Sequence, residues 1–128
     1  MAQEWLRHVM RQEVRFVGHN VKYDYVLLRK HGIDIKDVHF DTMLATYECF
    51  GDWDFFNLGA VVKRLLGRAI RPYRELVGEG QTLLDLPFKD LVEHACADAD
   101  MTLRLYHRLQ VLPALRNRGF LSIAGWGE

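Results

Sequence analysis

The sequence predicts an α/β domain in which amphipathic helices cover a small sheet. Short apolar runs rich in β-branched and aromatic residues, such as VRFVG at residues 14–18, alternate with stretches that repeat apolar residues at helical spacing. Size points the same way, because 128 residues with 49% hydrophobic content suit one domain with a buried core.

The first half of the chain alternates predicted helices and strands. Residues 5–10 place Trp, Leu, Val and Met at helical spacing, and residues 14–18 read as a buried strand that ends in glycine. Asn20 stands where a helix cap is expected, before a helix that ends at His31–Gly32. Val38–Phe40 is the second predicted strand.

The second half is predicted to be helical. Asp41 and Thr42 open a helix through Tyr47, in which Asp41 is expected to cap the helix rather than contact metal. Asn57 is expected to cap a further helix that Gly67 ends. The remaining predictions are an irregular connection over residues 68–87 and one or two helices over residues 88–112.

The shortage of strands is itself informative. Two short strands do not make a stable sheet alone, and several amphipathic helices need a sheet face to cover. Further strands are therefore expected either outside these 128 residues or from another chain.

Composition narrows the class of protein. Lys and Arg total 17, equal to Asp and Glu, so the net charge is zero and does not favour binding to nucleic acid or to a membrane. A local charged patch would still be compatible with either partner. Cys49 and Cys96 are too few for a disulfide framework and indicate free thiols in a reducing compartment. The sequence has no signal-peptide layout and no apolar run of membrane-spanning length, so a cytoplasmic protein is expected.

Three side chains carry the clearest chemistry. Asp24 lies in the first turns of a predicted helix, and His94 and Asp98 are one turn apart on the last helix, where they share a face. Carboxylates among apolar residues are costly to bury unless they are paired or bind metal. Each of these residues also has a purely structural explanation. Asp24 could be a surface acid that interacts favourably with a helix N-terminus, and His94 and Asp98 could be a solvent-exposed pair.

A basic segment is the best candidate for contacts to phosphate. Arginines cluster around the end of the fourth predicted helix and the connection after it, with one tyrosine among them. A solvated helix end is the alternative explanation. The candidate nucleic-acid-binding residues here are Arg64, Arg68, Arg71, Tyr73 and Arg74.

Four blocks together resemble a known family. VGHNVKYD, HGIDIKDVHFDTMLATYE, NLGAVVKRLLG and HACADADMTLRLYHRL are similar, in order and spacing, to the 3′–5′ exonuclease domain of bacterial DNA polymerase I. The resemblance runs from Val14 to Arg118. It implies the DEDD superfamily and an RNase H-like exonuclease fold, a plan that RNase D-type exoribonucleases share.

The resemblance also implies a site and a reaction. Family members hold two divalent metals with four carboxylates and cleave the phosphodiester bond at single-stranded 3′ ends. By the family motifs Asn20 shapes the site, Asp24 serves mainly the second metal, and Asp98 is a ligand of the first. His94 stands where the polymerase branch has a tyrosine that orients the attacking water. The implied cofactors are Mg²⁺ or Mn²⁺, which suit carboxylate oxygens.

The sequence departs from the family at the first motif. No Asp-x-Glu occurs anywhere in the chain, and the family carries this motif on an N-terminal antiparallel hairpin. The resemblance therefore implies a partial exonuclease-like domain over residues 1–118 that lacks this hairpin, followed by a tail over residues 119–128. Such a site is expected to bind Mg²⁺ weakly, and for the same reason this chain alone is expected to be incomplete or inactive as a catalyst.

Alternatives to a proofreading-type exonuclease remain open at this stage. One is a module that keeps the fold but has lost its chemistry and serves nucleic-acid binding or oligomerisation. In that case an open sheet edge would pair with a second copy or with a partner chain. Another is an RNase D-like exoribonuclease, with RNA rather than single-stranded DNA as the substrate.

Overall fold

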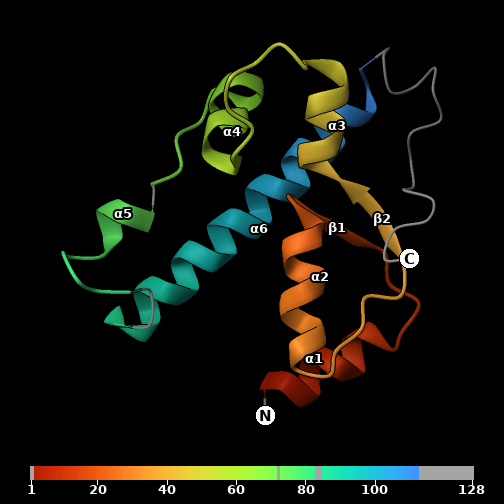
Figure 1. Ribbon diagram of the computed structural model, residues 1–128, viewed down its shortest axis with the longest axis vertical. Helices are drawn as coiled ribbons and strands as arrows, with labels where there is room; N and C mark the ends of the chain where they lie inside the picture. The colour runs from red at the N-terminus through yellow and green to blue at the C-terminus, as the bar shows by residue number, and fades with distance from the viewer. Residues whose placement is uncertain (1, 72, 83–84, 113–128) are drawn as a thin grey trace.

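The computed structural model describes residues 2–71, 73–82 and 85–112. It has a mixed α/β architecture, as the sequence predicts, with a long C-terminal helix against a small sheet (Figure 1). The elements are α1 (Ala2–Met10), β1 (Phe16–Gly18), α2 (Val21–Lys30), β2 (Val38–Asp41), α3 (Thr42–Cys49), α4 (Leu58–Leu66), α5 (Tyr73–Leu76) and α6 (Phe88–Gln110).

The sheet brings the ends of its two strands to the same place. Among the described residues it consists of β1 and β2, which are parallel, with Val17 opposite Phe40 and Gly18 opposite Asp41. Parallel strands meet the same edge with their carboxyl ends. The loop into α2 and the start of α3 therefore lie side by side at that edge.

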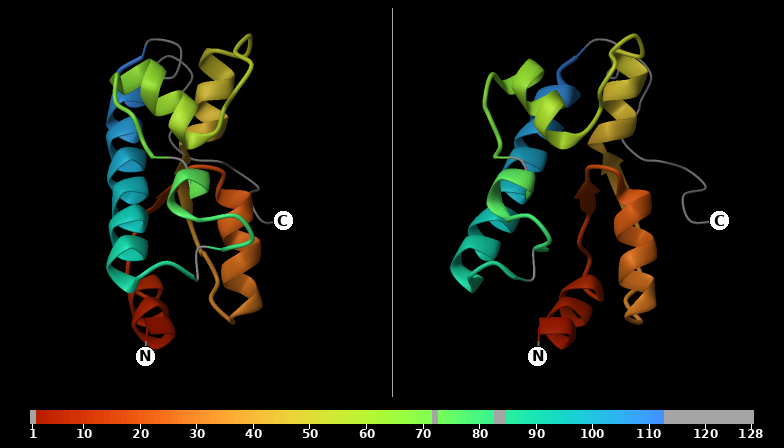
Figure 2. Two further views of the ribbon diagram at one scale, coloured as in Figure 1. Left: turned by 90° about the vertical axis from the view of Figure 1, so that its left-hand side faces the viewer. Right: turned by 60° about the vertical axis from the view of Figure 1, so that its left-hand side comes forward.

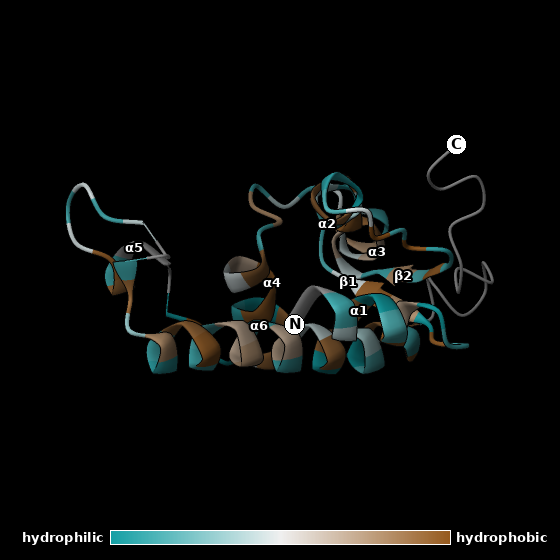
Figure 3. Cartoon of the chain, turned by 90° about the horizontal axis from the view of Figure 1, so that it is seen from below, coloured by the Kyte–Doolittle hydropathy of each residue, from teal (hydrophilic) through white to brown (hydrophobic). Residues whose placement is uncertain are grey.

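The helices form layers on the two sides of the sheet. Figure 3 shows α6 along one side and α2 with α3 on the other, and Figure 2 gives the same arrangement from two further directions. Helix α6 also contacts α4, which extends the packed layer beyond the sheet. The long helix is thus the element against which the rest of the domain is arranged.

Two clusters of buried side chains hold these layers together. The larger joins β2, α3, α4 and the C-terminal half of α6 and contains Phe40, Ala45, Val61, Val62, Leu105 and Leu109. The smaller lies under α2 and contains Val21, Ile35 and Val38. The N-terminal half of α6, where His94 lies, is outside both clusters of buried residues.

Most predicted elements are confirmed. Residues 88–110 form one helix, which is within the prediction of one or two, whereas the connection over residues 68–87, predicted to be irregular, contains the short helix α5. Asn20 and Asn57 occupy the predicted N-cap positions, although neither side chain makes a capping hydrogen bond. At Asn20 the backbone differs from that of an ordinary cap, because its φ of 66° is left-handed whereas capping residues are usually extended.

Three further predictions concern the whole chain. Cys49 and Cys96 are free thiols, as predicted. Within residues 2–71, 73–82 and 85–112, no helix combines the length and the apolar character needed to cross a bilayer. The predicted tail over residues 119–128 lies outside the described residues, as does the last part of the predicted domain.

Candidate functional site

Asp41 is the polar centre of the edge at which both strands end. Its side chain is 1% exposed. Oδ1 accepts N–H hydrogen bonds from Met43 and Leu44 at 2.9 and 3.3 Å, which confirms the predicted cap of α3. The same carboxylate also accepts from Asn20 at 3.1 Å and from Val21 at 2.8 Å, which the sequence analysis did not anticipate.

Asn20 adopts an unusual backbone conformation between β1 and α2. Its φ of 66° lies in the left-handed region, which asparagine tolerates better than most residues. The side chain is exposed and lines a shallow groove with Lys22, Tyr23 and other residues of α2. The side chain is therefore open to solvent, and its role in shaping the site stays a prediction.

Asp24 is half-buried in the first turn of α2, against the end of β1. A Cβ atom built on Gly18 would lie 3.3 Å from Oδ2 of Asp24, so the carboxylate lies close to the strand backbone. Burial, followed by the negative charge of Asp41, raises the pKa of Asp24 above its ordinary value. The ionised carboxylate is thus disfavoured by its surroundings, and a cation bound to it would offset that cost.

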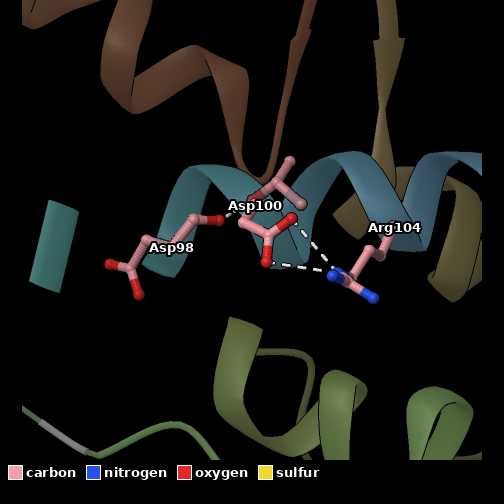
Figure 4. A network of polar contacts seen from close by, with 4 residues as sticks. Asp98, Asp100 and Arg104 are labelled. Atoms are coloured by element: carbon pink, nitrogen blue, oxygen red, sulfur yellow. Dashed lines mark hydrogen bonds and ion pairs between the residues drawn. The ribbon is translucent and has the colours of Figure 1, made fainter. Parts of the chain in front are cut away.

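His94 and Asp98 form the pair that their spacing on α6 predicts. Nε2 of His94 lies 3.5 Å from Oδ2 of Asp98, and the two side chains are 14% and 40% exposed. Figure 4 shows the Asp98 carboxylate pointing away from the neighbouring Asp100–Arg104 ion pair. One oxygen-bearing group and one imidazole are therefore presented together on a partly open face of the helix.

A cavity of about 400 Å³ lies beside His94, between α6 and the segment that follows α4. The sequence analysis missed it, although Asp90, His94, Ala97 and Met101 recur at helical spacing and so mark one face of α6. The cavity has both polar and apolar walls. Its lining residues are Ala69, Ile70, Arg71, Leu76, Leu86, Asp90, Glu93, His94, Ala97 and Met101.

The basic cluster separates into members with different surroundings. Arg71 lines the cavity beside His94, whereas the Arg64 guanidinium lies 4.5 Å from the centre of the Trp53 ring, in a cation–π contact. Arg68 is exposed. The side chains of Tyr73 and Arg74 lie outside the described residues. Arg71 is therefore the member that the structure brings to the candidate site.

The described carboxylates do not complete a metal centre. In the part of the chain that the structure describes, no group of three or more His, Cys, Asp or Glu side chains could hold one ion. The oxygen donors of Asp24 and Asp98 have the right chemistry for Mg²⁺ or Mn²⁺. Because Mg²⁺ demands several well-placed oxygens, Asp24 and Asp98 could hold it only together with further ligands.

His19 is a structural residue of the site that the sequence analysis missed. Its Nε2 donates to the carbonyl oxygen of Phe56 at 2.7 Å, and its Nδ1 lies 2.7 Å from Oγ1 of Thr42. A histidine in a loop has no periodic pattern that would predict these partners. It ties the turn before α2 both to the start of α3 and to the loop before α4.

Protonation of His19 is expected to cost stability as pH falls. Burial lowers the pKa of His19 below its ordinary 6.5, outweighing the hydrogen bond to Phe56 and the charge of Asp41, which raise it. The unfolded chain then binds the proton more tightly, so stability is kept above pH 6.5 and is lost as pH falls below it. The measurement is the urea midpoint of unfolding between pH 7.5 and 5.5. The midpoint should fall less steeply with decreasing pH in His19→Gln than in the wild type, and equal slopes would contradict a contribution from His19 protonation.

Gly18 leaves no room for a side chain between β1 and α2. A Cβ atom there would lie 2.8 Å from Cγ2 of the fully buried Val21, so Gly18→Ala is expected to destabilise the fold by about 1–3 kcal/mol. Gly59→Ala is the matched control, because its Cβ would meet Asn57 only at an ordinary 3.7 Å. Thermal unfolding of both variants checks this. Equal shifts in melting temperature would show that the close approach at Gly18 does not affect stability.

Comparison with known proteins places these features in context. The family model for a 3′–5′ exonuclease matches residues 1–112. The chain is 31% identical to the DNA polymerase I of Rhizobium leguminosarum over 115 residues, covering 88% of this chain and 11% of that protein. It is also 31% identical to the DNA polymerase I of Treponema pallidum over 121 residues, covering 92% of this chain and 12% of that protein. The chain thus spans about a tenth of the length of these relatives.

Proposed function

This chain belongs to the 3′–5′ exonuclease family found in DNA polymerase I-like proteins, and on that premise we propose a proofreading-type role. The proposed reaction is metal-dependent hydrolysis of the last phosphodiester bond at a single-stranded DNA 3′ end. The observation that carries the proposal is the His94–Asp98 pair on α6, which lies beside a cavity that Arg71 also lines.

Each residue of the candidate site has a proposed role. Asp24 and Asp98 are metal ligands, and bound Mg²⁺ or Mn²⁺ would stabilise the charge on the attacking and leaving oxygens. His94 orients the attacking water, and an unprotonated imidazole can accept its proton. Its small exposed fraction of 14% supports this role, because a fixed ring holds a water in one place.

The cavity beside His94 suits the terminal nucleotide. Its volume of about 400 Å³ lies within the range of small-molecule sites, roughly 300–1,000 Å³. Arg71 would pair with a phosphate, and the apolar wall that includes Ile70 and Met101 would face a base. The acidic side chains of Asp90 and Glu93, which line the cavity from α6, oppose a phosphate, which favours its placement at the Arg71 side.

The remaining metal ligands are proposed to come from a strand beside β1. The chain contains no Asp-x-Glu, and β1 pairs only with β2 among the described residues. An unpaired strand edge is a template for another strand. A strand from elsewhere in a longer polypeptide, from a second copy or from a partner chain would cover this edge and could place two further carboxylates near Asp98.

The test is release of nucleotides from a 5′-labelled single-stranded DNA, with Mg²⁺, with Mn²⁺ and with EDTA. Where a strand beside β1 supplies the remaining ligands, a ladder shortened from the 3′ end only in the presence of metal is the expected result, and an RNA of the same sequence is expected to be degraded more slowly. Faster degradation of the RNA would favour an exoribonuclease. Binding of the DNA without any metal-dependent release would overturn the catalytic proposal and leave a binding module.

A further inference from the structure

We propose that Asp41 is a positioning residue that fixes the start of α2, and with it the direction in which Asp24 is presented. This inference rests on the proposed function of Asp24. An N-cap carboxylate ordinarily serves only the helix that it precedes. Asp41 serves two helices whose first turns lie about twenty residues apart in the chain.

The geometry links the two helix starts through one carboxylate. Four backbone N–H groups point at it, from Asn20 and Val21 on one side and from Met43 and Leu44 on the other. The first N–H groups of a helix have no partner within the helix. Asp41 therefore supplies an acceptor for the N–H groups of Asn20 and Val21 at the start of α2.

The charge of Asp41 suits this double role. Each helix start carries a partial positive charge, and two of them surround the one carboxylate of Asp41, which is 1% exposed. A neutral side chain of similar shape would keep fewer of these bonds. The stabilisation is therefore expected to depend on the carboxylate itself and not only on the space that it fills.

A second set of contacts fixes the same turn from the other side. Oγ1 of Thr42 lies 2.7 Å from Nδ1 of His19 and 3.2 Å from the carbonyl oxygen of Gly18, and its single proton is donated to one of these two acceptors. The two residues before Asn20 thus contact Thr42 at the start of α3, while Val21 after it bonds Asp41. Asp24 lies in the first turn of α2, so these contacts also set the direction of its carboxylate.

The deciding variant is Asp41→Ser, with Asp41→Asn beside it. A serine hydroxyl still reaches the first N–H groups of its own helix, so α3 keeps a cap, but it is too short to bond α2 as well. Amide hydrogen exchange at Asn20 and Val21 is expected to accelerate by about tenfold or more, while Met43 and Leu44 change little. Asp41→Asn should retain part of the protection. Asp85→Ser is the matched control, because Asp85 bonds only a local turn at Thr82.

A second readout reports on Asp24. Signal broadening by Mn²⁺ at the amides of residues 23–25 is expected in the wild type and at several-fold higher Mn²⁺ in Asp41→Ser. If exchange is accelerated in Asp41→Ser but Mn²⁺ broadens no amide signal in the wild type, the proposed metal function is contradicted, and with it the link to Asp24. Unchanged exchange at Asn20 and Val21 would overturn the positioning role, whatever the metal does.

A milder variant covers the case in which Asp41→Ser does not fold. Thr42→Val keeps the volume of a fully buried side chain and removes only the hydroxyl that bonds His19 and Gly18. It is expected to accelerate exchange at Asn20 relative to Leu44. Equal acceleration at both amides would indicate general destabilisation and would contradict a specific clamp on α2.

Discussion

Replacement of Asp24 or Asp98 by alanine is expected to lower metal-dependent release of nucleotides by about a hundredfold or more. Metal ions contribute several kcal/mol to transition-state stabilisation, and each 1.4 kcal/mol is about a factor of ten in rate. Loss of either carboxylate would remove a ligand from a site that already has few in this chain. Single-turnover assays on 5′-labelled DNA at saturating Mn²⁺ measure the effect.

Asp100→Ala is the matched control on the same helix. Asp100 is about half-exposed and forms an ion pair with Arg104 at 3.1 Å, facing away from Asp98 (Figure 4). Its loss is expected to leave the rate within about twofold, because exposed ion pairs contribute little. Equal losses in Asp98→Ala and Asp100→Ala would contradict a specific metal role for Asp98. Activity that survives in both Asp24→Ala and Asp98→Ala would assign the nuclease to another protein in the preparation.

Asp24→Asn is expected to stabilise the fold at neutral pH while it removes the proposed metal ligand. The pKa of Asp24 is raised in the folded state, mainly by burial and then by the charge of Asp41. The folded state therefore holds the proton more tightly than the unfolded state, and stability is lost as pH rises from about 3.8 through the raised value. A neutral amide escapes this loss. Thermal unfolding at pH 7 without metal checks it, and a lower melting temperature for Asp24→Asn would contradict it.

The sequence predicts the elements well because their signals are local. Helical spacing in α1, α2 and α6, and short β-branched runs at β1 and β2, are each contained within a few residues of chain. The helix caps show the limit of prediction from local signals. Asp41 was predicted to cap its own helix, but its bonds to Asn20 and Val21 join positions about twenty residues apart, which no local pattern contains.

The candidate site likewise has one part that the sequence predicts and another that it does not. The His94–Asp98 pair follows from residues one turn apart on a single helix, and the structure brings the two side chains within 3.5 Å. The cavity beside His94 needs α6 and the segment after α4 together, so only the α6 half of its lining could be found by spacing. The contacts of His19 depend on three separate loops and helix starts, and a single sequence offers no pattern for them.

Phe40→Ala is expected to destabilise the domain by about 3–5 kcal/mol. The Phe40 side chain is 1% exposed, and its ring centre lies 5.1 Å from that of Tyr106 in an edge-on arrangement. Domains are stable by only about 5–15 kcal/mol, so this loss would remove a large fraction of the total. The urea midpoint of unfolding measures it.

Phe55→Ala is the matched control, because that ring is 71% exposed and its loss is expected to cost less than about 0.5 kcal/mol. Phe40 immediately precedes Asp41, and its packing against α6 holds the end of β2 where the carboxylate can reach both helix starts. Hydrogen exchange at Val21 should therefore accelerate in Phe40→Ala even where the domain remains folded. A cost no greater than that of Phe55→Ala would contradict the central place of Phe40 in the core.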